Sequence, residues 1–146
     1  MANKQLVILL RFEKEKEQQR AQELQTAEQA YQDNLSRLSS IGDFRLEYMK
    51  KVQQRSLEGI DSATYGHYHA FINKLDNASG QIEIAIKQAQ ALAQQCKQQW
   101  LLQHQKVKAV ELLLSKQQQK LALIAAKKEQ KMFDEIATQQ FVRRHY

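Results

Sequence analysis

Residues 65–124 decide the fold, and they read YGHYHAFINKLDNASGQIEIAIKQAQALAQQCKQQWLLQHQKVKAVELLLSKQQQKLALI. Steps of three and four residues, taken alternately through this stretch, reach 18 positions, of which 15 are apolar. These seam positions are Tyr65, Tyr68, Ile72, Leu75, Ser79, Ile82, Ile86, Ala89, Ala93, Cys96, Trp100, Gln103, Val107, Val110, Leu114, Gln117, Leu121 and Ile124. A 3.5-residue repeat keeps one stripe of a helix against a partner helix, so the stretch predicts a long coiled-coil helix.

The chain before this stretch contains a matching but less regular seam. Over about residues 4–55 the same spacing recurs, but the charged residues Glu13, Glu17 and Arg20 interrupt it. Its apolar positions are Leu6, Leu10, Leu24, Ala27, Tyr31, Leu38, Ile41, Tyr48 and Val52. We therefore expect a first helix that packs on the second through a looser seam.

A short connection separates the two seams. Residues 56–62 read SLEGIDS, in which Gly59 suits a left-handed cap at the end of the first helix. Asp61 or Ser62 can cap the start of the second helix. Because so short a connection makes consecutive helices antiparallel neighbours, residue 54 is expected opposite about 63, and residue 4 opposite about 113.

The sequence thus predicts an all-α protein, with two long helices in an antiparallel coiled coil that forms an α-helical hairpin. We expect the first helix at about 4–55, the turn at about 56–62 and the second helix at about 63–140. The second helix overhangs the first by roughly 25 residues on this register. A single coiled-coil domain is expected over residues 1–146.

Composition agrees with helices and points to the cytoplasm. The chain has no proline and four glycines, which leaves few residues to break a helix or to close hairpins. Cys96 has no cysteine to pair with, which fits a reducing compartment. The apolar run over residues 6–10 is too short for a membrane span or for the core of a signal peptide. We expect a soluble, cytoplasmic protein.

No catalytic or metal-binding arrangement is expected. His67 and His69 are two residues apart, which on a helix turns their side chains about 200° from each other, so they cannot chelate one metal. His104 and His145 have no carboxylates or cysteines at ligand spacing. The sequence contains no glycine-rich phosphate loop and no nucleophile elbow, and two helices form no deep pocket. We expect no enzyme activity, no small-molecule substrate and no cofactor.

Two groups of apolar residues exceed what the seam needs. The first is near the turn, where Phe44 and Tyr48 form one i, i+4 pair and Phe71 and Leu75 another. These residues either widen the core at the end of the coil or form an exposed docking patch. The second group lies in the overhang. Its residues are Lys127, Lys128, Lys131, Met132, Phe133 and Ile136, and this helix end either frays or binds a partner.

The charge of the chain leaves two further alternatives. Residues 87–146 carry 11 basic and 4 acidic side chains, so they hold the whole excess behind the net charge of +6. A basic helix can bind nucleic acid through its phosphates, although these lysines lack aromatic neighbours for base stacking and a solvated helix face is the default. A self-assembling coil, in which overhangs pair between copies, is the other alternative.

Two motifs carry a resemblance to a known family. Residues 65–75, YGHYHAFINKL, directly after the turn, and residues 131–135, KMFDE, before a basic tail, resemble FliJ, the flagellar type III export protein. The resemblance implies a component of the export apparatus, at the cytoplasmic face of the inner membrane, that is shaped like the central stalk of rotary ATPases. A stalk of a virulence type III secretion system is the close alternative.

The resemblance also implies partners and sites. The partners would be the flagellar export ATPase hexamer (FliI-like), the export gate protein (FlhA-like), through which alone the chain would meet the membrane, and export chaperones. Phe44, Tyr48, Phe71 and Leu75 would form the gate-binding patch at the tip. The ATPase ring would bind the overhang, at Lys127, Lys128, Lys131, Met132, Phe133 and Ile136. The chain would couple ATP hydrolysis to the export of flagellar subunits.

Overall fold

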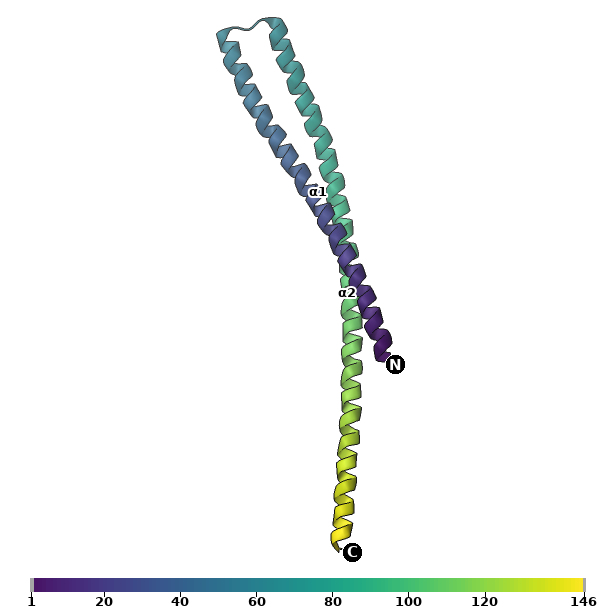
Figure 1. Cartoon of the computed structure of the whole chain (residues 1–146). Coiled ribbons are helices and arrows are strands. Elements are labelled where there is room, and N and C mark those ends of the chain that lie inside the picture. Colours follow the sequence, from purple (N-terminus) through teal and green to yellow (C-terminus); the bar gives the residue numbers. More distant parts are fainter. Residues whose placement is uncertain (1, 146) are drawn as a thin grey trace. The chain divides into compact units, whose positions relative to one another are not determined.

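The computed structural model describes residues 2–145 and consists of two helices joined by a short connection (Figure 1). Helix α1 comprises Ala2–Glu58, and helix α2 comprises Ser62–His145. The described part of the chain contains no strand, so the predicted all-α hairpin is confirmed. Both helices extend a few residues beyond the ends that the apolar spacing marks, because an apolar stripe reports where a helix is covered and not where it stops.

The connection at residues 59–61 reverses the chain through two local caps. Gly59 has a φ of 87°, the left-handed conformation that a side chain disfavours, and its N–H donates to the carbonyl of Ser56 at 3.3 Å. At the start of α2 the Asp61 carboxylate accepts from the backbone N–H of Thr64 at 2.9 Å. Of the two candidate caps it is therefore Asp61 that caps α2. Hydrogen bonds from the side chain and then the backbone of Thr64 lower the pKa of Asp61.

The chain divides into two compact units, and each helix contributes to both. The hairpin unit comprises residues 19–101 and contains the connection. The terminal unit comprises residues 2–18 of α1 and residues 102–145 of α2.

In the hairpin unit the two helices pack along the predicted seam. Ala27, Val52 and Ile72 are buried, and the other seam positions from 68 to 100 are half-buried. Arg45 binds Asp76 through two guanidinium hydrogen bonds, the shorter at 2.6 Å from Nε to Oδ1. This hydrogen bond and the charge of Asp76 raise the pKa of Arg45. The Arg45–Asp76 pair lies within about one helical turn of the register expected from the turn, which places residue 45 opposite about 72.

Tyr65 is the one seam position of the hairpin unit that the structure does not bury. Its side chain is 44% exposed and packs edge-on against His69 of the same helix, with ring centroids 4.5 Å apart. The assignment of Tyr65 to the seam is therefore wrong. The physical reason is that the ring packs on His69 of its own helix, at the wall of an open groove that it lines with Val52, Gln53 and Ser56 of α1.

The terminal unit buries a polar layer as well as apolar residues. Val107 and Val110 are buried, and so is Gln103, whose side-chain amide donates to the backbone carbonyl and the carboxylate of Glu13. The Glu17 carboxylate lies 3.0 Å from Nδ1 of His104. The two glutamates that interrupt the first seam thus find polar partners on α2, which their spacing on α1 alone could not reveal.

The pairing of the helices ends near Gln117. Gln117 is half-buried, whereas each residue from 118 to 145 is exposed, including the seam residues Leu121 and Ile124. The predicted overhang of the second helix is therefore present. Its apolar side chains are not covered by any part of the chain that the structure describes.

Candidate docking surfaces

Within residues 2–145 the candidate sites predicted from the sequence are surfaces of the two helices. No group of three or more His, Cys, Asp or Glu side chains among these residues is placed to hold a metal ion. None of the described helices combines the length and the apolar character that crossing a membrane requires. The search for function therefore turns to exposed apolar side chains, which mark interaction sites.

The first surface is an aromatic patch at the tip of the hairpin unit. Tyr48 lies at its centre, with its ring centroid 4.7 Å from that of Phe71 on α2 and 6.3 Å from that of Phe44 on α1. Phe44 and Phe71 meet edge to face at 6.2 Å. Leu75 is half-buried one turn further along α2. We call Phe44, Tyr48, Phe71 and Leu75 the aromatic patch.

The sequence left open whether the residues of the aromatic patch widen the core or are exposed, and the structure shows some of them in each position. Tyr48 and Leu75 are half-buried and widen the core, whereas Phe44 and Phe71 stay exposed. Tyr68 extends the cluster toward the turn. Its ring packs edge-on against that of Tyr48, with centroids 5.4 Å apart, and its hydroxyl accepts a hydrogen bond from Arg55 at 2.8 Å. Sequence reasoning assigned Tyr68 to the seam and missed its place in this cluster, because the register of both helices is needed to see it.

The second surface is the overhang. Met132, Phe133 and Ile136 are all exposed and fall within an arc of about 100° on α2, since a helix turns about 100° per residue. The three lysines predicted with them are exposed, but only Lys127 and Lys131 project from the opposite side of the helix, whereas Lys128 lies about 40° around the helix from Met132. The overhang therefore has an apolar face bordered by Lys128 and a basic side that carries Lys127 and Lys131.

A third surface, which sequence reasoning did not single out, lies on the paired part of the terminal unit. Ile8 and Phe12 are 69% and 52% exposed and form a row on the side of α1 opposite the half-buried Leu10. On α2, Leu102 and Leu113 are exposed on the flanks of the seam, about 140° and 120° around the helix from the buried Val107 and about 80° and 60° from the buried Val110. We call these four residues the outward row. The sequence did contain a signal for this third surface. Positions 6–10 are five consecutive apolar residues, and a seam uses only two of them.

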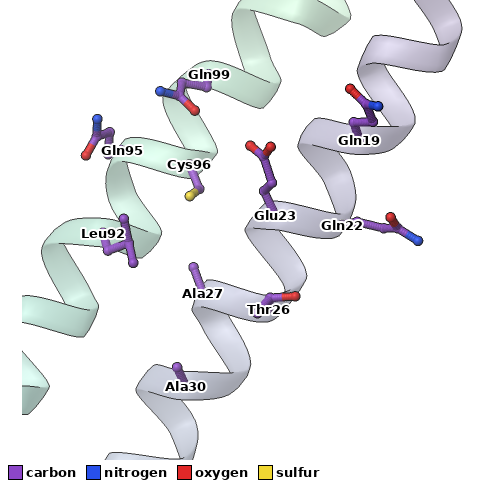
Figure 2. A pocket seen from close by; sticks show the side chains of 10 residues that line it. All are labelled: Gln19, Gln22, Glu23, Thr26, Ala27, Ala30, Leu92, Gln95, Cys96 and Gln99. Carbon is purple, nitrogen blue, oxygen red and sulfur yellow. The ribbon is translucent and has the colours of Figure 1, made fainter.

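A groove of about 800 Å³ between the helices of the hairpin unit offers little chemistry (Figure 2). Its floor is formed by small residues, and the Cys96 side chain points between the helices toward Ala27. Glutamines occupy most of its rim, at positions 19, 22, 95 and 99. Cys96 is a free, half-buried thiol. The groove arises because alanines on the seam are too small to fill the space between two helices.

Comparison with known proteins gives the family. No curated protein and no solved structure was found to match the chain. The family model of the flagellar FliJ protein matches residues 2–145, which is nearly the full length. The hairpin, the overhang and the aromatic tip described above are thus features of a chain that belongs to the FliJ family and is a component of the flagellar type III protein export apparatus.

Proposed function

We propose that this protein is a central-stalk-like coiled coil of the export apparatus, which binds the export ATPase ring through its terminal unit and the export gate through the aromatic patch. It acts in the cytoplasm, at the inner-membrane face of the apparatus. By contacting successive ATPase subunits it couples ATP hydrolysis to the export of flagellar subunits.

The observation that carries this proposal is the distribution of exposed apolar side chains in the terminal unit. The outward row places them on the side of α1 opposite the seam and on the flanks of the seam on α2. By contrast, α1 of the hairpin unit exposes no large apolar side chain between residues 19 and 43, and α2 exposes only Ile84 and Leu92 between residues 76 and 101. Apolar side chains that the partner helix leaves exposed mark surfaces where other proteins bind. A ring that encloses the terminal unit would cover all of these side chains at once.

The overhang fits the same partner. Its apolar face can pack against the inner wall of a ring, while the lysines beside and opposite that face can meet acidic side chains of the ring subunits. The aromatic patch is of a different kind, since it is small and is held by ring contacts between the two helices. It suits a short apolar segment such as the linker of a gate protein.

The proposal is tested with the purified protein and the flagellar export ATPase of the same source. Hexamer assembly and ATP turnover are measured for the wild type, for Phe133→Ala, for an Ile8→Ser, Phe12→Ser double variant, and for a Phe71→Ala, Leu75→Ala double variant. Leu57→Ala is the matched control, because Leu57 is 85% exposed at the tip and belongs to neither surface.

We expect the wild type to promote hexamers and to raise turnover, and we expect the two terminal-unit variants to lose both effects. The Phe71, Leu75 variant should keep them and lose binding to the cytoplasmic region of the gate. If the wild type leaves assembly and turnover unchanged, the stalk function is wrong. If the tip variant fails with the ATPase and the terminal variants do not, the division between tip and tail is wrong.

A further inference from the structure

The tip of the hairpin unit carries a second apolar surface, on the flank opposite the aromatic patch. It is a groove of about 540 Å³ whose floor is formed by the buried Val52 and Ile72. Leu46, Met49 and Tyr65 form its exposed walls, although none of them is needed by the seam. We call it the tip groove. Its lining residues are Leu46, Met49, Lys50, Val52, Gln53, Ser56, Tyr65, His69 and Ile72.

The tip groove and the aromatic patch do not overlap. None of the four patch residues lines the groove. On α1 the groove residue Met49 is about 140° around the helix from Phe44, and on α2 His69 is about 160° from Phe71. The ion pair of Arg45 with Asp76 lies beyond Leu46, on the groove's flank of the tip. Two partners can therefore occupy the two flanks of the tip at the same time.

The groove has the dimensions of a helix-binding site. Its α1 wall extends from Leu46 to Ser56, a separation of ten residues that spans about 15 Å at a rise of 1.5 Å per residue. A partner helix of three turns has that length. Grooves between two packed helices accept the apolar face of a third helix through side chains at i, i+3, i+4 and i+7. Met49 suits such a contact, because its flexible thioether adapts to different partners.

The charge of the groove points to an acidic partner. Lys50 lines the groove, and the structure gives it no ion pair among the described residues. His69 adds an imidazole that can donate to a carboxylate, and no Asp or Glu lines the groove. A carboxylate on the partner would thus meet a free ammonium group without repulsion from a neighbouring acid.

We propose that the tip groove binds a three-turn amphipathic helix of a partner protein, with an apolar face in the groove and glutamates or aspartates toward Lys50 and His69. The overhang of this chain is a poor occupant, whether from the same copy or from a second one. Residues 118–145 carry six lysines and arginines against three acidic residues, so their net charge repels Lys50. The inference does not depend on the ATPase or gate contacts proposed above.

A synthetic peptide and methyl NMR test this site in the full-length protein. The probe is a 14-residue helical peptide with leucines at heptad spacing and glutamates elsewhere, and its twin carries lysines in place of the glutamates. The chain has three methionines, Met1, Met49 and Met132, so labelled methionine methyl groups report on the groove and on the overhang together. The acidic peptide should shift the Met49 signal in a saturable way and leave the Met132 signal in place.

Neighbouring variants separate the contributions. Lys50→Glu should weaken the acidic peptide about fivefold or more and favour the basic twin, whereas Lys51→Glu, which does not line the groove, should have little effect. A Leu46→Gln, Met49→Gln double variant should abolish binding. Because this variant lacks the Met49 methyl group, its binding is measured through the ring signals of Tyr65. Phe71→Ala should leave binding unchanged. If the acidic peptide moves Met132, or moves no methyl signal, or binds no better than its basic twin, the inference is wrong.

Discussion

At the residue scale, a few polar side chains fix how the two helices meet. Asp61 caps α2 directly after the left-handed Gly59, so the chain reverses at one defined place. Gln103 is buried and donates to Glu13, which links the two helices of the terminal unit by polar contacts. Such a layer favours one register, because a shift of either helix would leave buried polar groups without their partners.

The Asp61 cap makes the stability of the hairpin depend on pH. Because the folded-state pKa of Asp61 is lowered, the cap stabilises the fold above the unfolded-state pKa, and this contribution is lost as the pH falls through the folded-state pKa. Asp61→Ala should therefore lower the melting temperature at pH 7, and the difference from the wild type should shrink between about pH 5 and pH 2. Thermal unfolding of both proteins across this range is the measurement. A difference that grows in acid would contradict the assignment.

Replacement of Gln103 tests the polar layer. Gln103→Leu removes the donor that Glu13 accepts from and should cost about 1–3 kcal/mol of unfolding free energy. A second substitution, Glu13→Leu, should recover most of this loss, because two apolar residues can pack where one unmatched carboxylate cannot. Urea unfolding of both single variants and the double variant gives the coupling energy. Gln105→Leu, at an exposed position of the same helix, is the control.

At the scale of the element, α2 combines a stiff seam with two glycines near the tip. Gly66 and Gly80 are both in the helix, and neither has an atom within 4 Å of the place where a Cβ would stand. Glycine costs about 1 kcal/mol relative to alanine in a helix interior, because it has more backbone freedom to lose. The first third of α2 should therefore open more readily than the part that follows.

Amide exchange measures this difference along α2. We expect faster exchange over residues 63–85 than over residues 90–115, and slower exchange near both sites in a Gly66→Ala, Gly80→Ala variant. Since an added methyl group meets no neighbour, the double variant should also be more stable by about 2 kcal/mol. Uniform protection along the wild-type helix would show that the glycines do not soften the tip.

At the scale of the whole molecule, the chain separates the surfaces that bind partners from the contacts that hold the fold. The aromatic patch and the tip groove lie on two flanks of the hairpin unit, whereas the outward row and the overhang belong to the terminal unit. The seam supplies the packing in both units. Residues 118–145 contribute nothing to that packing, since all of them are exposed.

Truncation after Gln117 tests this separation. The shortened chain should unfold at nearly the same urea concentration as the full chain, because no paired residue is lost. It should fail to promote assembly of the export ATPase while still binding the gate. Circular dichroism during urea unfolding, combined with the ATPase and gate assays, checks all three expectations. A large fall in stability would mean that the overhang supports the hairpin.

The sequence by itself determined the class of fold and the position of the turn. The seam from Tyr68 to Gln117, the reversal at Gly59 and the overhang all follow from residue spacing and local cap chemistry, which depend on near neighbours in the chain. The two motifs of the FliJ family were equally readable.

Only the tertiary structure decided which side chains meet across the two helices. In the structure the ring of Tyr68 contacts that of Tyr48, and Glu13 accepts a hydrogen bond from Gln103. Tyr65 is exposed, and the tip groove lies beside Met49. The physical reason is that a 3.5-residue repeat tells which side of one helix faces inward, but a contact also depends on the register and the flank of the other helix. Those two quantities exist only once both helices are packed together.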